Sequence, residues 1–150
     1  MFHSIRWRIA VPYLVLIILA MVGLALYLSR LVRDAYLTDL EGKLTAEARV
    51  IADALATSPE WDEPEGDLDY AAQHYADLLD ARVTLIRADG VVLGESHEDR
   101  TQMDNHLLRP EVQTALAAEQ GASIRHSRTV GYEMMYAAVQ VREGDASKGF

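Results

Sequence analysis

The sequence predicts an α+β fold, in which a long N-terminal helix leads into an antiparallel sheet with flanking helices. Three observations predict it. Residues 9–28 are apolar and carry no charge. The residues after them repeat apolar side chains every three or four positions, as a helix with one apolar face does. Beyond residue 80, short alternating segments separated by glycine-containing turns indicate strands.

The apolar stretch 9–28 reads IAVPYLVLIILAMVGLALYL. These twenty residues would span roughly 30 Å as a helix, about the hydrocarbon thickness of a bilayer. The alternatives are a buried core helix and a cleavable signal peptide. A signal peptide has a shorter apolar core, of about 7–15 residues, and then a small-residue cleavage site, which the following SRLV does not resemble. We therefore expect a basic flank over 1–8 and an uncleaved transmembrane helix over 9–29.

A membrane-proximal helix is expected over 30–57, ended by the Ser58-Pro59 pair because proline disfavours helical geometry in the residue before it. Its apolar side chains form one stripe. The stripe has two explanations: it packs on the sheet of its own domain, or it pairs with a second chain. The members of the stripe are Leu37, Leu40, Leu44, Ala48, Ile51 and Leu55.

The next segment combines an acidic loop, a helix and a hairpin. Residues 60–69 carry six acids and predict a solvated loop, and residues 68–80 return to helical periodicity. Two alternating segments then flank Asp89-Gly90. This dipeptide readily supplies the positive φ angles of a tight hairpin turn, so we expect a hairpin over 83–93.

A third helix and two further strands are expected after residue 108. Pro110 suits the first position of a helix, and Gly121 is expected to end it. Strand-like runs follow over 122–128 and 132–141, with Thr129-Val130-Gly131 as the turn between them.

Charge is distributed unevenly along the chain, whose formal net charge is −9. Four arginines and no acid precede Asp34, whereas all 23 acidic residues lie from Asp34 onward with only ten basic ones. Sequence-independent binding of nucleic acid requires a surface rich in lysine and arginine. The strongly acidic composition after Asp34 therefore argues against this class of function. The chain also has no cysteine, which excludes a disulfide framework, a thiolate metal site and a thiol nucleophile.

The segment VTLIRADGVVLGES, residues 83–96, resembles the central hairpin of phosphate-regulon-type sensor histidine kinases. The layout of a membrane helix before an antiparallel sheet is similar to a PAS-like or single-Cache sensor module. Further matching residues continue in order along the chain. They are Asn105-His106, Arg109-Pro110-Glu111-Val112, Gly121, Arg125, Ser127, Thr129 and Met135-Tyr136.

The resemblance implies a sensor domain over 58–141 and, beyond this sequence, a second membrane helix, a HAMP relay, a phospho-accepting histidine helix and an ATP-binding domain. It also implies a further strand after Val141. Residues 142–150 are polar and weakly strand-like, so we expect an atypical tail there, a sheet without its closing strand and a truncated chain. The intact parent would be an ATP-dependent protein-histidine kinase. We assign this chain no catalytic residue and no cofactor, because ATP and Mg²⁺ belong to the missing kinase core.

The resemblance therefore predicts the sensory fragment of a two-component kinase in the bacterial inner membrane. It would cross the bilayer once, with residues 30–150 outside the cytoplasm. The positive-inside count does not favour that orientation by itself. Expected partners are the lipid bilayer, a second copy in a homodimer, an unknown small ligand or envelope signal, and a response regulator through the kinase core alone. The alternatives are the sensor region of a chemoreceptor or nucleotide cyclase, and a stand-alone membrane-anchored binding protein.

Four residues are candidates for ligand binding: His106, Arg109, Arg125 and Tyr136. Arginine suits carboxylate or phosphate groups through its bidentate fork, and histidine changes charge near physiological pH. The alternatives are a structural role for His106 and salt bridges for the arginines, which include Arg128.

A metal site is possible by composition in the loop that holds His97, Glu98, Asp99, Asp104 and His106. Histidine and carboxylate ligands suit zinc or manganese. Because crowding in a loop sets no helical geometry, we expect no metal site there.

Overall fold

A computed structural model describes residues 5–63, 67–126 and 131–150. The chain divides into two compact units, Met1–Leu40 and Glu41–Phe150, and each is described by itself. The fold is α+β, with one long N-terminal apolar helix followed by small antiparallel sheets and further helices, as predicted. Arg128, Thr129 and Val130, which the sequence places at the end of a strand and in a turn, lie outside the described residues.

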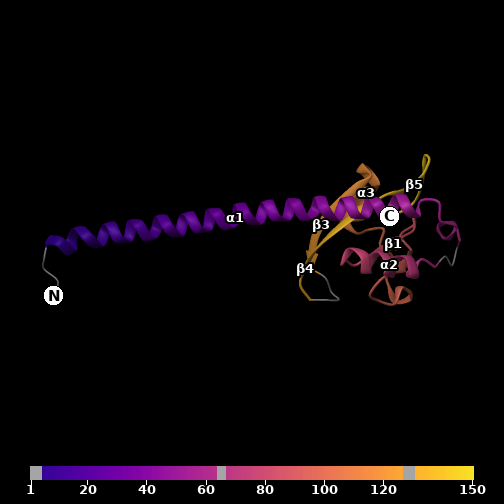
Figure 1. The fold of residues 1–150 in the computed structure, drawn as a ribbon, viewed down its shortest axis with the longest axis horizontal. Coiled ribbons are helices and arrows are strands. Elements are labelled where there is room, and N and C mark those ends of the chain that lie inside the picture. Colours follow the sequence, from indigo (N-terminus) through magenta and orange to yellow (C-terminus); the bar gives the residue numbers. More distant parts are fainter. Residues whose placement is uncertain (1–4, 64–66, 127–130) are drawn as a thin grey trace. The chain divides into compact units, whose positions relative to one another are not determined.

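The first unit consists of the N-terminal part of helix α1 (Ile5–Leu55) (Figure 1). Pro12 lies inside this helix, where its nitrogen cannot donate the usual hydrogen bond to the carbonyl oxygen four residues earlier. The large apolar side chains of this part are exposed, for example Leu19 at 66% and Leu26 at 60%. By length and composition α1 could span a membrane, so the predicted helix over 9–29 agrees with the structure at this level.

The second unit begins with the last turns of α1 and contains all of the strands. Its other helices are η1 (Pro59–Trp61), α2 (Asp69–Leu79), η2 (Arg100–Gln102) and α3 (Pro110–Ala118). Its strands are β1 (Thr84–Ile86), β2 (Val92–Glu95), β3 (Gln120–His126), β4 (Glu133–Val139), β5 (Val141–Glu143) and β6 (Ala146–Gly149).

The strands form three antiparallel hairpins: β1–β2, β3–β4 and β5–β6. The predicted turn between β1 and β2 is present, with Gly90 at φ +89°. β4 and β5 are separated by Gln140 alone. β6 in turn reaches β1, because the amide nitrogens of Ile86 and Phe150 each donate to the other's carbonyl oxygen, at 2.9 and 2.7 Å.

The expectation of a polar tail without a closing strand is therefore wrong. Residues 141–149 form the β5–β6 hairpin, and Phe150 after it is buried. Local propensity predicts no strand here, but the backbone bonds to β1 and the burial of Phe150 outweigh that preference.

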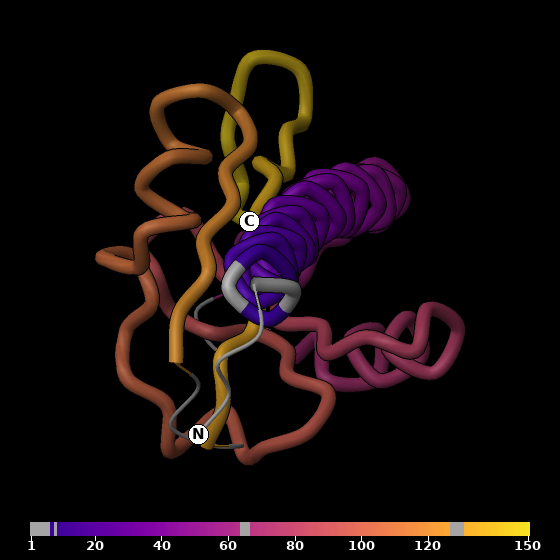
Figure 2. Tube along the Cα trace, turned by 90° about the vertical axis from the view of Figure 1, so that its left-hand side faces the viewer, coloured from indigo at the N-terminus to yellow at the C-terminus, as the bar shows by residue number. Residues whose placement is uncertain are grey.

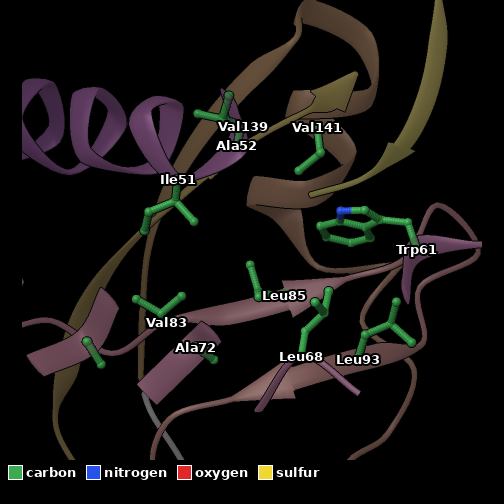
Figure 3. Packing of buried hydrophobic residues seen from close by; sticks show 11 residues of the cluster. Ile51, Ala52, Trp61, Leu68, Ala72, Val83, Leu85, Leu93, Val139 and Val141 are labelled. Atoms are coloured by element: carbon green, nitrogen blue, oxygen red, sulfur yellow. The ribbon is translucent and has the colours of Figure 1, made fainter. Parts of the chain in front are cut away.

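One face of these strands packs against α1 and α2. Ile51 and Ala52 of α1 meet Ala72 of α2 and Leu85 of β1 in this first core cluster (Figure 3). Of the predicted apolar stripe, Ile51 is in the cluster, and Ala48 and Leu55 pack against it. This part of the stripe therefore packs within its own domain.

The first core cluster also includes Trp61, which is 2% exposed, so the prediction of a solvated loop from residue 60 is wrong at this position. The indole nitrogen of Trp61 donates to the carbonyl oxygen of Leu55 at 2.8 Å. That oxygen lies in the last turn of α1, where carbonyl groups lack an intrahelical partner. Trp61 therefore fastens the end of α1 to the core.

The opposite face packs against α3. Val112 and Ala115 of α3 form a second core cluster with Ile86, Ala138 and Phe150. Figure 2 shows α2 and α3 on opposite sides of the strands. The strands of this unit therefore separate two cores, one shared with α1 and α2 and one shared with α3.

Gly121 lies inside β3 and does not end α3 as predicted; Glu119, with φ of +66°, is the residue after the helix. Gly121 faces α3 closely. A β-carbon on it would collide with the carbonyl oxygen of Glu111 and lie 2.5 Å from Cβ of Thr114. Glycine is required here because it lets α3 approach the strand.

We predict that Gly121→Ala lowers the free energy of unfolding by about 1–3 kcal/mol, because the added methyl group overpacks the α3–β3 contact. The measurement is urea unfolding of the full chain in detergent, followed by tryptophan fluorescence, to which the buried Trp61 contributes. Gly42→Ala is the matched control, since a β-carbon at that helical position meets nothing within 4 Å. It should raise stability by up to about 1 kcal/mol. Equal effects of the two substitutions would contradict the close packing of α3.

Candidate functional site

Charged and polar side chains extend the α3 side of the strands beyond the second core cluster. Side chains alternate between the two faces of a strand, so Ser123 and Arg125 share the face of Gly121, which lies against α3. Tyr136 of β4 is paired with Ser123 in the register of the β3–β4 hairpin. Glu111 reaches the same place from the first turn of α3.

Glu111 is the centre of the first group. It is 4% exposed, and its carboxylate accepts from the Ser123 hydroxyl at 2.6 Å and from two guanidinium nitrogens of Arg125 at 3.2 and 3.3 Å. The guanidinium carbon of Arg125 lies 3.6 Å from the ring centroid of Tyr136, a cation–π contact. The charge of Arg125 is therefore held by one carboxylate and one aromatic face.

Glu95 is the centre of a second group, formed on β1 and β2. Its side chain is fully buried and accepts from Nε of Arg82 at 2.8 Å and from the hydroxyl of Thr84 at 2.7 Å. The backbone amide of His97 donates to it at 3.0 Å. These three donors compensate the cost of burying a carboxylate.

His106 is the most buried of the predicted ligand-binding residues, with 5% of its surface exposed. Its amide donates to the carbonyl oxygen of Gly90 at 2.8 Å, and its Nδ1 lies 2.5 Å from the carbonyl oxygen of Asp104. Burial, and after it the positive charge of Arg109, lower the pKa of His106 from its ordinary value of 6.5. Burial therefore favours the neutral form of this imidazole.

Arg109 is the residue before α3, and its side chain makes no capping hydrogen bond to that helix. It is partly buried. Burial, and after it the like charge of Arg125, lower the pKa of its guanidinium. Among residues 5–63, 67–126 and 131–150, no carboxylate forms an ion pair with Arg109.

Of the four predicted ligand-binding residues, Arg125 and Tyr136 are in direct contact, and the backbone amide of Arg109 donates to the carbonyl oxygen of His106 at 3.1 Å. Arg109 and Arg125 both act electrostatically on His106, and Tyr136 stacks on Arg125. Arg128 lies outside the described residues. Tyr132 precedes β4 and is 61% exposed.

Sequence reasoning missed the two buried carboxylates that organise the site. No sequence motif singles out Glu111, in the first turn of α3, or Glu95, at the end of β2. The alternation of Gly121, Ser123 and Arg125 on one strand face was the available signal for a polar surface opposite α3.

A separate polar pocket of about 520 Å³ lies where α2 ends beside β1 and β2. Arg82 lines it and also bonds to Glu95, so this residue borders both features. Among the described residues, no group of three or more histidine and acidic side chains is placed to hold a metal ion. The other residues that line the polar pocket are Gln73, Ala76, Asp77, Asp80, Ala81, Ser96 and His97.

Comparison with known proteins adds no assignment. No protein-family model matches the sequence, and no curated protein matches it.

The lowered pKa of His106 predicts a pH dependence of stability. The unfolded state binds a proton near pH 6.5 and the folded state only at lower pH, so the contribution of neutral His106 is present above pH 6.5 and is lost as the pH falls below it. Urea unfolding of the chain and of His106→Gln between pH 8 and 5 measures this. The variant should lose less stability on acidification than the native chain. His74→Gln, at an exposed position on α2, is the control and should follow the native chain; parallel curves for all three would contradict the prediction.

Proposed function

We propose that the chain is the signal-input region of a membrane-bound sensor histidine kinase. The resemblance of residues 83–141 to phosphate-regulon-type kinases supports this proposal. So does the β6 strand, since the resemblance implies a further strand after Val141. The finer PAS-like or single-Cache identity of the domain belongs to the same proposal.

One observation carries the proposal: the helix that contains the membrane-length apolar stretch also contributes to the core of the second unit. Ile51 and Ala52 of α1 lie in the first core cluster, and Trp61 binds the last turn of α1. A change in the packing of that core therefore acts directly on α1. This is the connection that a receptor needs between its binding domain and its membrane segment.

In the proposed mechanism, a small ligand or envelope signal shifts the population of two packing arrangements, and α1 carries the shift in a homodimer. The intact kinase would transfer the γ-phosphoryl group of ATP to its own histidine and then to an aspartate of a response regulator. That chemistry, with ATP and Mg²⁺, belongs to a kinase core beyond the residues of this chain.

The sensor region of a chemoreceptor or nucleotide cyclase and a stand-alone anchored binding protein are the alternatives. The coding sequence after the Phe150 codon discriminates between them. A second apolar span followed by a phospho-accepting histidine motif supports the kinase, whereas a chemoreceptor signalling domain, a cyclase domain or a native stop codon overturns it.

The proposed location is the bacterial inner membrane with residues 30–150 outside the cytoplasm. Fusions after Phe150 test it. Alkaline phosphatase, which needs export to become active, should be active there, and green fluorescent protein should be dark. The fusion should stay in the membrane fraction at its full length, because 9–29 is proposed to be uncleaved.

Deletion of residues 9–28 is the control for these fusions and should reverse both signals. A bright fluorescent fusion with inactive phosphatase in the undeleted chain would place the domain in the cytoplasm and overturn the extracytoplasmic sensor. A product shortened by about 30 residues would instead identify a signal peptide.

A further inference from the structure

Trp61 lies where the end of α1 meets the C-terminal strand β6. Its indole nitrogen donates to the carbonyl oxygen of Leu55, in the last turn of α1, at 2.8 Å. The same ring lies against the backbone of Gly149 in β6, because a β-carbon on this glycine would be 2.6 Å from Cζ3 of Trp61. The ring is 2% exposed and shares the first core cluster with Val141 of β5 (Figure 3). One side chain therefore contacts both the helix that enters this unit and its last strand.

An ion pair holds the same two segments together at the surface. Nζ of Lys148, in β6, lies 2.6 Å from a carboxylate oxygen of Asp62, the residue after Trp61. Glu143 of β5 approaches the same ammonium group at 3.3 Å. Because the side chain of Asp62 is 65% exposed, this pair adds little stability by itself. Its effect is to fix β6 beside η1.

The β5–β6 hairpin has little buried surface of its own. Residues 142–147 are exposed, and burial begins at Gly149 and Phe150. Backbone hydrogen bonds join β6 and Phe150 to β1 and the turn after it, at Ile86 and Ala88. Segments with few buried contacts open locally at a lower free energy than the whole domain unfolds. β6 is therefore suited to alternate between a seated and a released position.

We propose that Trp61, Lys148 and Gly149 form a latch that ties the end of α1 to the seating of β6. With β6 seated, the backbone of Gly149 and the ammonium group of Lys148 keep η1 in place, and the indole holds the last turn of α1. Release of β6 removes these contacts and weakens the bond between the indole and Leu55. Coupling between two sites is reciprocal, so a displaced α1 should also loosen β6. The use of this latch in signalling rests on the proposed function, in which α1 carries the signal.

The test is hydrogen exchange of the isotope-labelled full chain in detergent micelles, followed by NMR. Gly149→Ala unseats β6, because its β-carbon would collide with Trp61 and with the carbonyl oxygen of Ile86. Exchange should become at least about fivefold faster at the Phe150 amide, which reports β6. The same acceleration is expected at the Trp61 indole and at the Ser58 amide, which donates to the last turn of α1. Exchange in the β3–β4 hairpin should change less than about twofold.

Ser147→Ala is the matched control on the same strand, because Ser147 is exposed, and it should leave these rates unchanged. Faster exchange at Phe150, with native rates at the Trp61 indole and the Ser58 amide, would overturn the latch. Native rates throughout would overturn it as well, since Gly149 would then not be packed against Trp61. Equal acceleration in the β3–β4 hairpin would show that β6 is not released separately, which also contradicts the proposal.

Lys148→Gln is a milder variant, which also takes the place of Gly149→Ala if that chain does not fold. It removes the ion pair with Asp62 and should speed exchange at the Phe150 and Ser58 amides about twofold. Unchanged rates at both amides would overturn the contribution of this pair to the latch.

Trp61→Phe tests the connection itself. Phenylalanine keeps an aromatic ring in the core but has no donor for the carbonyl oxygen of Leu55. In this background Lys148→Gln should still speed exchange at Phe150 and should no longer change the rate at Ser58. An equal effect on Ser58 with and without the indole donor would overturn the role of Trp61.

Exchange and topology are measured separately. Failure of the latch leaves the membrane-sensor proposal standing, and an inward-facing fusion leaves the latch standing.

Discussion

The buried ion pair between Glu111 and Arg125 is the interaction on which the α3 side of the molecule depends. It joins the first turn of α3 to β3, and the Ser123 hydroxyl completes the bonds of the carboxylate. Removal of Arg125 would leave the buried charge of Glu111 without its cationic partner, a loss that typically costs about 3–5 kcal/mol. The pair also engages Glu111, the carboxylate whose charge raises the pKa of Arg109 against the opposing effects of burial and Arg125.

The strands of the second unit separate two environments with different chemistry. The face that packs against α1 and α2 is apolar, and Trp61 is part of its core. The face that packs against α3 is apolar around Val112 and carries the Glu111–Arg125 ion pair next to that apolar part. A ligand on the charged side would meet α3 and β3. Its effect would reach the apolar side through strands that both cores share, such as β4, where Ala138 faces one core and Val139 the other. In the proposed sensor, this is the route from the binding site to α1.

Much of this fold follows from local signals in the sequence. The Asp89-Gly90 turn, the proline at the start of α3 and the helical periodicity before residue 55 predict elements that the structure contains. β6 could not be predicted in this way, because Ala146-Ser147-Lys148-Gly149 has little strand propensity. The backbone bonds that hold this end of the chain join Phe150 to Ile86, some sixty residues earlier. Residue type makes His106, Arg109, Arg125 and Tyr136 candidates for ligand binding. The carboxylates that organise them depend on contacts between α3 and β3 that no local pattern specifies.

Burial and the positive charges of Arg109 and Arg125 together hold the pKa of His106 below its ordinary value. Measurement of the pKa of His106 by NMR, in the full chain, tests it most directly. The pKa should lie below 6.5 in the native chain and should rise in Arg109→Gln, while Arg142→Gln leaves it unchanged. A native pKa at or above 6.5, or the same value in the native chain and in Arg109→Gln, would contradict the account.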